Sequence, residues 1–387
     1  MLDAIPVVQI IICVASGGLA SLLPPLRRPS GFLLLSLLGV IAAHRQSTLG
    51  FVLINGIVFL FALTLARVAS RRDAAQKFRW RWSCVALIAL IGAFLIGRWL
   101  ELESSGFSLA GVRWSLFSFD MWLLLRLVTF FWEFGSGRIA RPDLLSFTVW
   151  TCMPFTILGP ALRYSQFEPQ LPWSPPDPEK KSDLYSKAWL LKLLAAAALI
   201  IGGVALVNLH STMYADGGEG LPLWAKLSDA FGVSPWSFLL LWGGYYKLME
   251  CLALTWYVAL PPSFNRPFGR PNISEFWANW NMSATSIFRD YLFYIRWGQR
   301  RPNLYLNTMI IFLLVGLWHG VNWYWVIFGV MHGAGFCCFI WYRQRRDLKR
   351  FEITGIPFQL FGRVFTYIFV CSCWIVPSRI LKLLGRI

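Results

Sequence analysis

The chain has 387 residues, of which 57% are hydrophobic and 14% charged, and its formal net charge is +17. Ordinary globular domains have about 25% charged residues, so this composition excludes a soluble globular protein and predicts an all-helical integral membrane protein. The basic residues lie in short clusters between apolar runs, which favours cytoplasmic loops beside membrane lipids and argues against nucleic acid as a partner.

The first third of the chain predicts four full membrane spans and one shorter apolar segment. The shorter segment, Phe32–Ala43, is either tilted and extended by its flanks or re-entrant. A dense basic cluster between Arg67 and Arg81 predicts a cytoplasmic loop. The four spans are expected at Pro6–Leu23, Leu49–Val68, Ser83–Leu100 and Trp114–Phe134.

The next apolar stretch, Leu144–Pro160, is interrupted by Pro154 and by Gly159-Pro160, and basic residues flank it on both sides. Flanks of the same sign favour a re-entrant hairpin, whose irregular backbone is buried in protein or lines a cavity. An ordinary loop broken by proline is the alternative. The proline-rich linker from Gln170 to Pro178 is expected on the cytoplasmic side.

The second half of the chain predicts spans on both sides of a segment rich in aromatic and basic residues. This segment, Pro261–Asn303, suits a helix at the cytoplasmic interface. Its arginines can bind the phosphates of a thioester donor or the acidic face of a carrier protein. Glu275 and Asp290 are expected to pair with some of these arginines. The expected spans are Lys187–Leu209, Trp236–Leu260, Leu304–Trp318, Val321–Tyr342 and Phe358–Pro377.

The length allows roughly eight to eleven spans in total. With the spans above, the basic tail after Pro377 falls outside the cell, against the rule that positive charge stays inside. Either the last segment is re-entrant or one earlier span is miscounted.

Polar residues beside these apolar runs predict a site, because lipid offers no hydrogen-bond partner to an unpaired group. His319 is flanked by Gly316 and Gly320, which let another backbone or a ligand approach closely. A neutral imidazole can take the proton of an acceptor hydroxyl as its oxygen attacks a thioester carbonyl. Asn281 can orient that nucleophile or donate to the developing oxyanion.

Tryptophans supply rigid walls with one hydrogen-bond donor each, at Trp277, Trp280 and Trp318. A further histidine, His332, lies within a nearly unbroken apolar run. For both His319 and His332, the alternative is a buried histidine that is satisfied within helix packing. Neither the four histidines nor the eight cysteines have metal-ligand spacing, so no structural metal is predicted.

Four groups of motifs stand in order between Gly159 and Gly333. They are Gly159-Pro160-Ala-Leu-Arg163-Tyr164-Ser-Gln-Phe167; Ser263-Phe-Asn265-Arg-Pro267-Phe268; Ile273-Ser-Glu-Phe276-Trp277-Ala-Asn-Trp280-Asn281-Met-Ser283 with Arg289-Asp290-Tyr291; and Trp318-His319-Gly320 with His332-Gly333. Together they resemble the membrane-bound O-acyltransferase superfamily. Within it they look most like the bacterial branch, which includes alginate O-acetyltransferases and the protein that D-alanylates teichoic acids.

The resemblance implies a multispan helical bundle with re-entrant segments and a central tunnel. It also implies that His319 is the catalytic histidine. Asn281 stands where the bacterial branch usually has histidine and many eukaryotic members have asparagine. The expected substrate-binding or supporting residues are Trp277, Trp280, Arg289, Trp318, His332 and Arg163. We expect one polytopic membrane domain over residues 1–387, with N-terminal spans in 1–143, the motif core in 144–333, and a C-terminal span and basic tail in 334–387.

The resemblance further implies an enzyme of the bacterial plasma membrane that places small acyl groups on cell-surface glycans. The expected donor substrate is a cytoplasmic thioester, acetyl-CoA or an acyl carrier protein, with no bound cofactor. An extracytoplasmic acyltransferase is the expected protein partner. One alternative is transfer of a longer acyl or an aminoacyl group to a lipid, alcohol or teichoic acid. The other is a transporter, although the half-helix repeats of transporters are not recognisable in the sequence.

Overall fold

The computed structural model describes most of the chain, in two units. Its described residues are 48–70, 75–99, 107–109, 112–114, 121–156, 159–171, 186–215, 220–296, 301–349 and 356–385, with a few positions before residue 39. The first unit comprises Met1–Leu191 and Met249–Pro261, and the second comprises Lys192–Leu248 and Pro262–Ile387. Most of the expected segment Pro6–Leu23, about half of Phe32–Ala43 and most of the linker after Gln170 lie outside the described residues.

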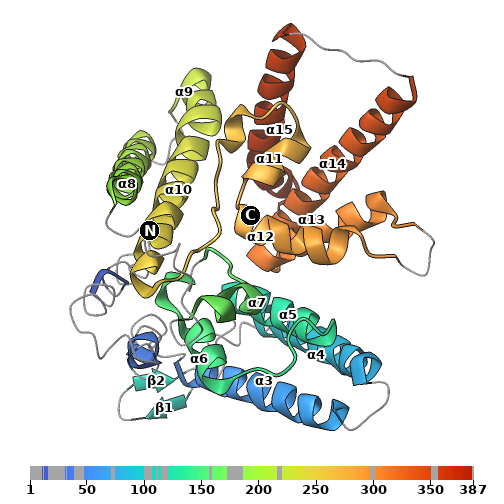
Figure 1. Ribbon diagram of the computed structural model, residues 1–387. Helices are drawn as coiled ribbons and strands as arrows, with labels where there is room; N and C mark the ends of the chain where they lie inside the picture. Colours follow the sequence, from blue (N-terminus) through green and yellow to red (C-terminus); the bar gives the residue numbers. More distant parts are fainter. Residues whose placement is uncertain are drawn as a thin grey trace. The chain divides into compact units, whose positions relative to one another are not determined.

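The first unit is built mainly of apolar helices (Figure 1). Its helices are α3 (Thr48–Ala69), α4 (Ala75–Trp99), α5 (Met121–Gly135), α6 (Leu144–Cys152) and α7 (Tyr164–Phe167), with 3-10 turns at Pro154–Thr156, Glu168–Gln170 and Leu254–Trp256. The all-helical prediction is confirmed apart from one antiparallel pair of strands, β1 (Phe107–Leu109) and β2 (Val112–Trp114). Strands of three residues are too short to give a recognisable sequence period.

Aromatic rings from α5, α6 and α7 form the core of the first unit. The ring of Phe130 lies 5.0 Å from Phe147, 6.1 Å from Trp150 and 5.6 Å from Tyr164, measured between centroids. The Tyr164 hydroxyl donates a hydrogen bond to Glu168 at 3.0 Å. Burial, with the Glu168 carboxylate nearby, raises the pKa of Tyr164, so the phenol remains a neutral donor.

Two charged side chains of α5, Arg126 and Glu133, are each only 1% exposed. The Arg126 guanidinium donates to the carbonyl oxygens of Trp150 at 3.3 Å and Thr151 at 2.9 Å. These carbonyls belong to the last turn of α6, where a cation is favourable because the helix dipole is negative there. The Glu133 carboxylate accepts a hydrogen bond from the Ser165 hydroxyl at 2.7 Å. Both charges thus hold neighbouring segments against α5.

The interruption expected in Leu144–Pro160 is present. Helix α6 ends at Cys152, a 3-10 turn follows at Pro154–Thr156, and the Gly159-Pro160 peptide bond is cis. Arg126 satisfies carbonyls that the break leaves without helical partners. The re-entrant path of this stretch stays a prediction.

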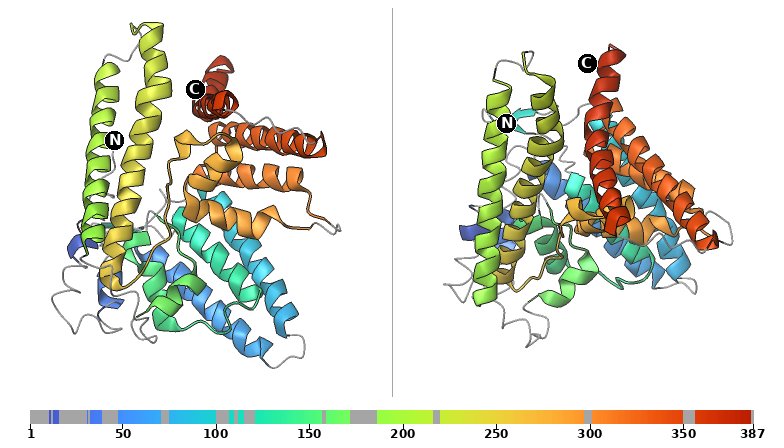
Figure 2. Two further views of the ribbon diagram at one scale, coloured as in Figure 1. Left: turned by 45° about the horizontal axis from the view of Figure 1, so that its top comes forward. Right: turned by 90° about the horizontal axis from the view of Figure 1, so that it is seen from above.

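The second unit contains four helices of 20 residues or more and several shorter ones (Figures 1 and 2). They are α8 (Lys187–Met213), α9 (Leu223–Ser228), α10 (Ser234–Ala253), α11 (Ile273–Asn279), α12 (Met282–Phe288), α13 (Leu304–His319), α14 (Trp323–Lys349) and α15 (Ile356–Leu383), with single π-helical turns at Asp229–Val233 and Arg289–Phe293 and a 3-10 turn at Pro267–Gly269. The short helices α11 and α12 occupy the segment in which the sequence showed no clear span.

Helices α8 and α10 run side by side, as both views in Figure 2 show. A Cβ atom placed on Gly203 would lie 2.6 Å from the backbone nitrogen of Leu241. A Cβ on Gly244 would lie 2.9 Å from the carbonyl oxygen of Ala196. Glycine is therefore required on both helices for this close approach.

The basic cluster after Arg67 differs from the expected loop. Helix α4 begins at Ala75, so several of the basic residues form its first turns. Arg79 is fixed there by hydrogen bonds to the carbonyl oxygens of Ile139 at 3.3 Å and Ala140 at 3.1 Å. Arginine and lysine are good helix formers, and hydropathy locates the apolar part of a helix rather than its end.

Two other expected boundaries were wrong. Helix α5 begins at Met121 rather than Trp114, which instead ends strand β2. Helix α15 continues through Pro377 to Leu383, so the residues expected to form a separate basic tail extend the helix. Neighbouring helices in a membrane protein can accommodate the backbone groups that proline frees.

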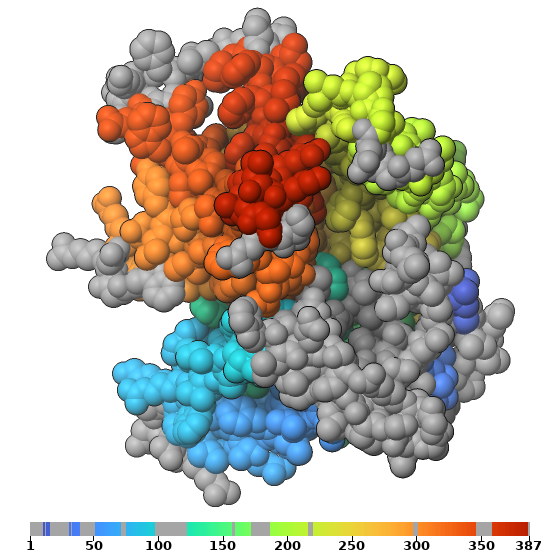
Figure 3. Space-filling view, turned by 180° about the vertical axis from the view of Figure 1, so that it is seen from behind, coloured from blue at the N-terminus to red at the C-terminus, as the bar shows by residue number. Residues whose placement is uncertain are grey.

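Five described helices are long and apolar enough to cross a membrane. The qualifying segments are Phe51–Ala69, Ala75–Ile96, Lys187–Met213, Trp323–Arg345 and Phe358–Leu383. Large apolar side chains on these helices face outward, including Ile88 at 73%, Ile201 at 69% and Phe361 at 64% exposure. Atoms of α15, coloured red, lie at the surface in Figure 3. Lipid is the environment that suits such faces, so the protein is a multi-pass membrane protein. The expected total of eight to eleven spans stays a prediction.

We expect Arg126→Leu to lower the thermal midpoint of the purified protein in detergent. The substitution leaves the α6 carbonyls without their donor, at a cost of about 1–3 kcal/mol for each buried unpaired group. Arg138→Gln is the matched control, because Arg138 is 57% exposed and lies 3.9 Å from Glu133. Unchanged midpoints for both variants would contradict the role assigned to Arg126.

Candidate active site

His319 is the last residue of α13, and its imidazole lies among aromatic rings. The imidazole stacks on the indole of Trp325 in α14 with centroids 4.6 Å apart and planes at 18°. Trp318 lies 4.9 Å away and Phe328 lies 6.3 Å away. The imidazole forms no hydrogen bond within the part of the chain that the structure describes, which leaves its ring nitrogens available to a substrate.

Glycines bring α13 and α14 into backbone contact beside His319. A Cβ atom on Gly316 would lie 2.2 Å from the carbonyl oxygen of Trp325, and a Cβ on Gly329 would lie 2.5 Å from that of Phe312. A Cβ on Gly320 would meet the Trp325 indole at 2.6 Å. The expectation that Gly316 and Gly320 permit close approach is confirmed, and the approaching group is α14 itself.

His332 lies in α14 and is fully buried, with 0% exposure. Its imidazole lies 5.0 Å from the indole of Trp277 at 81°, 5.8 Å from Phe312 and 4.5 Å from Phe328. Because Phe328 contacts both His319 and His332, the two imidazoles belong to one aromatic cluster. The structure thus brings together His319, His332, Trp277 and, through its ring contact with His319, Trp318.

Asn281 forms the connection between α11 and α12. Its backbone is left-handed, with φ 43° and ψ 53°, a conformation that asparagine tolerates better than most residues. The carbonyl oxygen of its side chain accepts a hydrogen bond from Ser283 at 3.4 Å. Among the described residues, no hydrogen bond joins Asn281 to His319. The turn conformation is a structural reason for asparagine here that spacing in the sequence could not reveal.

Trp280 anchors this turn in a second aromatic cluster. Its ring stacks on Phe276 at 5.3 Å and on Phe238 at 5.8 Å. Phe238 contacts Trp374 at 5.6 Å, and Trp374 contacts Trp325, on which His319 stacks, at 5.9 Å. Trp280 therefore supports the site through intervening rings rather than by lining the space beside His319.

Arg289 and Arg163 are the two arginines that were expected to bind substrate or support the site. Arg289 is exposed and pairs with Asp290 at 2.9 Å, as expected for that carboxylate. Glu275, for which pairing with an arginine was one possibility, has a structural role at the N-terminal cap of α11, where it accepts a hydrogen bond from Asn272 at 2.8 Å. Arg163 belongs to the first unit, where it is the residue before α7.

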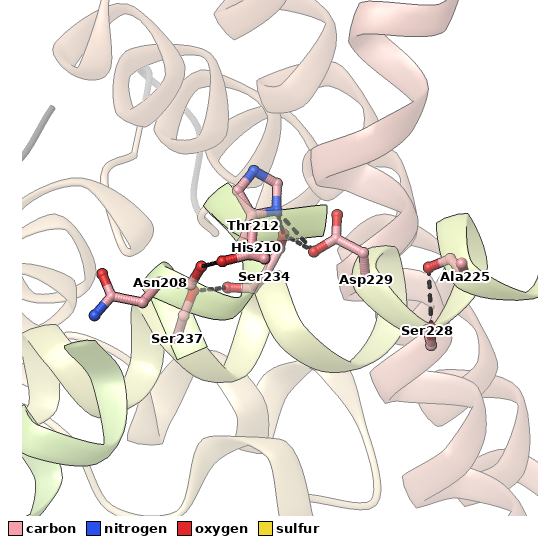
Figure 4. Close-up of polar contacts among 8 residues, drawn as sticks. All are labelled: Asn208, His210, Thr212, Ala225, Ser228, Asp229, Ser234 and Ser237. Carbon is pink, nitrogen blue, oxygen red and sulfur yellow. Dashed lines mark hydrogen bonds and ion pairs between the residues drawn. The ribbon is translucent and has the colours of Figure 1, made fainter. Parts of the chain in front are cut away.

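A polar cluster that the sequence did not reveal lies in the second unit (Figure 4). His210 near the end of α8 binds Asp229 through Nδ1 at 2.8 Å, and the Ser234 hydroxyl donates to the same carboxylate oxygen at 2.9 Å. In Figure 4 the other ring nitrogen of His210 points away from Asp229. The cluster ties α8 to the start of α10. Asp229 is 19 residues from His210 and 5 residues from Ser234 in the sequence, and neither spacing belongs to a recognisable motif.

Among the described residues, no group of three histidine, cysteine or acidic side chains is arranged to hold a metal ion. The candidate site consists of the imidazoles of His319 and His332 and the aromatic rings that contact them.

The sequence pattern of the membrane-bound O-acyltransferase family matches residues 70–376, and the chain belongs to this family. The match includes every residue that we expected to contribute to the site.

Curated relatives come from the bacterial branch. A peptidoglycan O-acetyltransferase of Helicobacter pylori is 28% identical over 134 residues, 34% of this chain and 25% of that protein. A probable alginate O-acetylase of Pseudomonas putida is 26% identical over 244 residues, 61% of this chain and 47% of that protein. A teichoic acid D-alanyltransferase of Lacticaseibacillus rhamnosus is 26% identical over 229 residues, 54% of this chain and 56% of that protein. The chain thus matches between a quarter and about half of the length of these relatives.

We expect Gly316→Val to reduce both stability and any activity that requires His319. The new side chain would collide with the Trp325 carbonyl and force α13 away from α14, which disturbs the stack on His319. Overpacking of this kind costs about 1–3 kcal/mol or more. The measurement is the thermal midpoint in detergent. Gly92→Val in α4 is the control, because a Cβ atom there would have no neighbour within 4 Å. Equal midpoints for the two variants would contradict this account of the helix contact.

Proposed function

We propose that this protein is an O-acyltransferase that moves a small acyl group, such as acetyl, from a cytoplasmic thioester to hydroxyls of a cell-surface glycan. The observation that carries the proposal is the His319 imidazole, held by aromatic rings and free of hydrogen bonds within the described residues. The family match and the names of the relatives support the reaction class.

In the proposed reaction, His319 takes the proton from the acceptor hydroxyl as that oxygen attacks the thioester carbonyl. A carbon–oxygen bond forms, the carbon–sulfur bond breaks, and the proton passes to the leaving thiolate. The stack on Trp325 fixes the imidazole plane, so the base loses little freedom when the substrate binds. The products are the O-acylated glycan and the free thiol of the carrier.

Asn281 has the proposed role of assisting at the carbonyl. Its side-chain oxygen is engaged by Ser283, while its amide nitrogen forms no hydrogen bond within the described residues. That nitrogen can donate to the oxyanion that develops on the thioester carbonyl.

The second candidate function is transfer of an aminoacyl group to a teichoic acid. The similarity to the teichoic acid D-alanyltransferase, whose match covers 56% of that relative, favours it. Both candidates use the same base and the same bond changes. They differ in the acceptor and in the acyl group, and the acyl group is identified when alkali releases it from the envelope.

The first test measures alkali-released acyl groups from envelope glycans of cells that lack this protein. Complementation with the wild type should restore acyl release, and His319→Ala at matched expression should not, because a general base contributes about 10²–10⁴-fold to rate. Release of alanine instead of acetate would select the second candidate. Unchanged acyl release in all strains would contradict both candidates.

A second test separates the backbone role of Asn281 from its chemical role. Glycine adopts the left-handed turn without strain, whereas alanine there costs roughly 1–2 kcal/mol. We therefore expect Asn281→Gly to keep the wild-type thermal midpoint but to lose about 10²–10³-fold in transfer rate, the cost of removing an oxyanion donor. Full activity of Asn281→Gly would limit Asn281 to shaping the turn.

A further inference from the structure

Three of the buried nitrogen atoms that have no hydrogen-bond partner among the described residues lie on two neighbouring rings of the second unit. Two are the Nδ1 and Nε2 atoms of His332, and the third is Nε1 of Trp277. The two rings are neighbours, 5.0 Å apart and nearly perpendicular. A neutral imidazole offers one donor and one acceptor, and an indole offers one donor. Buried polar groups normally have hydrogen-bond partners, so these neighbouring unpaired nitrogens indicate that a polar group binds here.

The phenylalanine rings that pack against His332 cannot supply the missing partners. The rings of Phe312, Phe328 and Phe369 lie 5.8, 4.5 and 5.9 Å from the His332 ring and have no hydrogen-bonding atoms. Thr308 lies one turn before Phe312 on the same face of α13, and its buried hydroxyl also has no partner among the described residues. No residue that the structure describes therefore supplies a partner for these nitrogens.

The unpaired nitrogens belong to the same aromatic cluster as His319. Phe328 contacts both imidazoles, at 6.3 Å from His319 and 4.5 Å from His332. From His332 the helix α14 continues to the exposed residues Arg343 and Arg345. The charge pattern places that basic end at the cytoplasmic side. His332 thus lies between His319 and the side from which a cytoplasmic donor would arrive.

We propose that His332 and Trp277 bind a secondary amide in the pantetheine arm of the acyl donor. This inference rests on the proposed function and adds the recognition of the donor. A secondary amide has one N–H and one carbonyl oxygen, so it can donate to the imidazole acceptor and accept from the imidazole or indole N–H. Its methylene groups match the phenylalanine walls. The binding holds the thioester carbon near His319 while the arm extends toward the basic end of α14.

The test compares two donors in two forms of the reconstituted protein. One donor is acetyl-pantetheine, and the other is its analogue in which the amide N–H nearest the sulfur is replaced by an ester oxygen. The variant is His332→Phe, whose ring fits an aromatic cage and lacks hydrogen-bonding atoms. We expect the variant to raise the KM and Kd of the amide donor about tenfold. The values for the ester analogue, the kcat and the KM of the acceptor should change little.

The thermal midpoint distinguishes the proposed binding role of His332 from a purely structural role. A structural role predicts that His332→Phe lowers the midpoint. Because His332→Phe replaces unpaired nitrogens with an apolar ring, its midpoint should equal or exceed that of the wild type. Trp277→Phe removes a donor to the carbonyl oxygen, which the amide and the ester both have, so it should raise the KM of both donors to a similar extent. A lower midpoint of His332→Phe with equal losses for both donors would assign His332 to packing or to a buried water and overturn the inference.

Acetyl-CoA and an acetylated acyl carrier protein share the pantetheine arm, so both are assayed. The carrier that the wild type uses identifies the source, and the effect of His332→Phe should appear with that carrier. A wild type that transfers acyl groups from neither would overturn the proposed donor class and this inference with it. An active wild type whose His332→Phe variant treats amide and ester donors alike would overturn this inference alone.

Discussion

The site depends on a contact between two helices whose closest approach is at glycines. Gly316 of α13 and Gly329 of α14 bring backbone against backbone, at distances that any Cβ atom would violate. Association within lipid has no hydrophobic driving force, so close packing and polar pairing must stabilise it. The contact places Trp325 against the imidazole of His319. The orientation of the proposed base is therefore a consequence of helix packing.

In these apolar surroundings the buried polar side chains are of two kinds, those with hydrogen-bond partners and those without a partner among the described residues. Arg126 and Glu133 are buried but bound to neighbouring segments, so they hold the first unit together. His332 and the half-buried Trp277 have buried nitrogen atoms that no described residue satisfies. The first kind of residue is needed for the fold. The second kind has a cost that binding a substrate would remove, and it is the kind of residue expected at a functional site.

The sequence predicted the helical class well because lipid permits few alternatives to helices and imposes long apolar runs. The helices at Leu49–Val68 and Lys187–Leu209 were placed within a few residues. Boundaries failed where helices continue beyond their apolar part, as at Arg79 and Pro377. Hydropathy reports what lipid covers, and helical hydrogen bonding continues past that limit.

The motifs named candidate residues for the site but not their arrangement. In the structure Trp277 contacts His332, and Phe328 links His332 to His319. The left-handed turn at Asn281 depends on backbone geometry, which residue type alone does not specify. The pair of His210 and Asp229 joins residues from different helices at a spacing that has no local pattern. Contacts of this kind arise from tertiary packing and cannot be read from a single sequence.

The most direct measurement of the central claim uses protein reconstituted in sealed vesicles, with a labelled thioester donor on one side and an acceptor glycan on the other. The account predicts that label appears on the glycan as an alkali-sensitive ester when the donor is on the side of the basic end of α14. It also predicts that His319→Ala, reconstituted at equal amount, abolishes this transfer. Equal transfer by the wild type and His319→Ala would contradict the claim that this imidazole is the base.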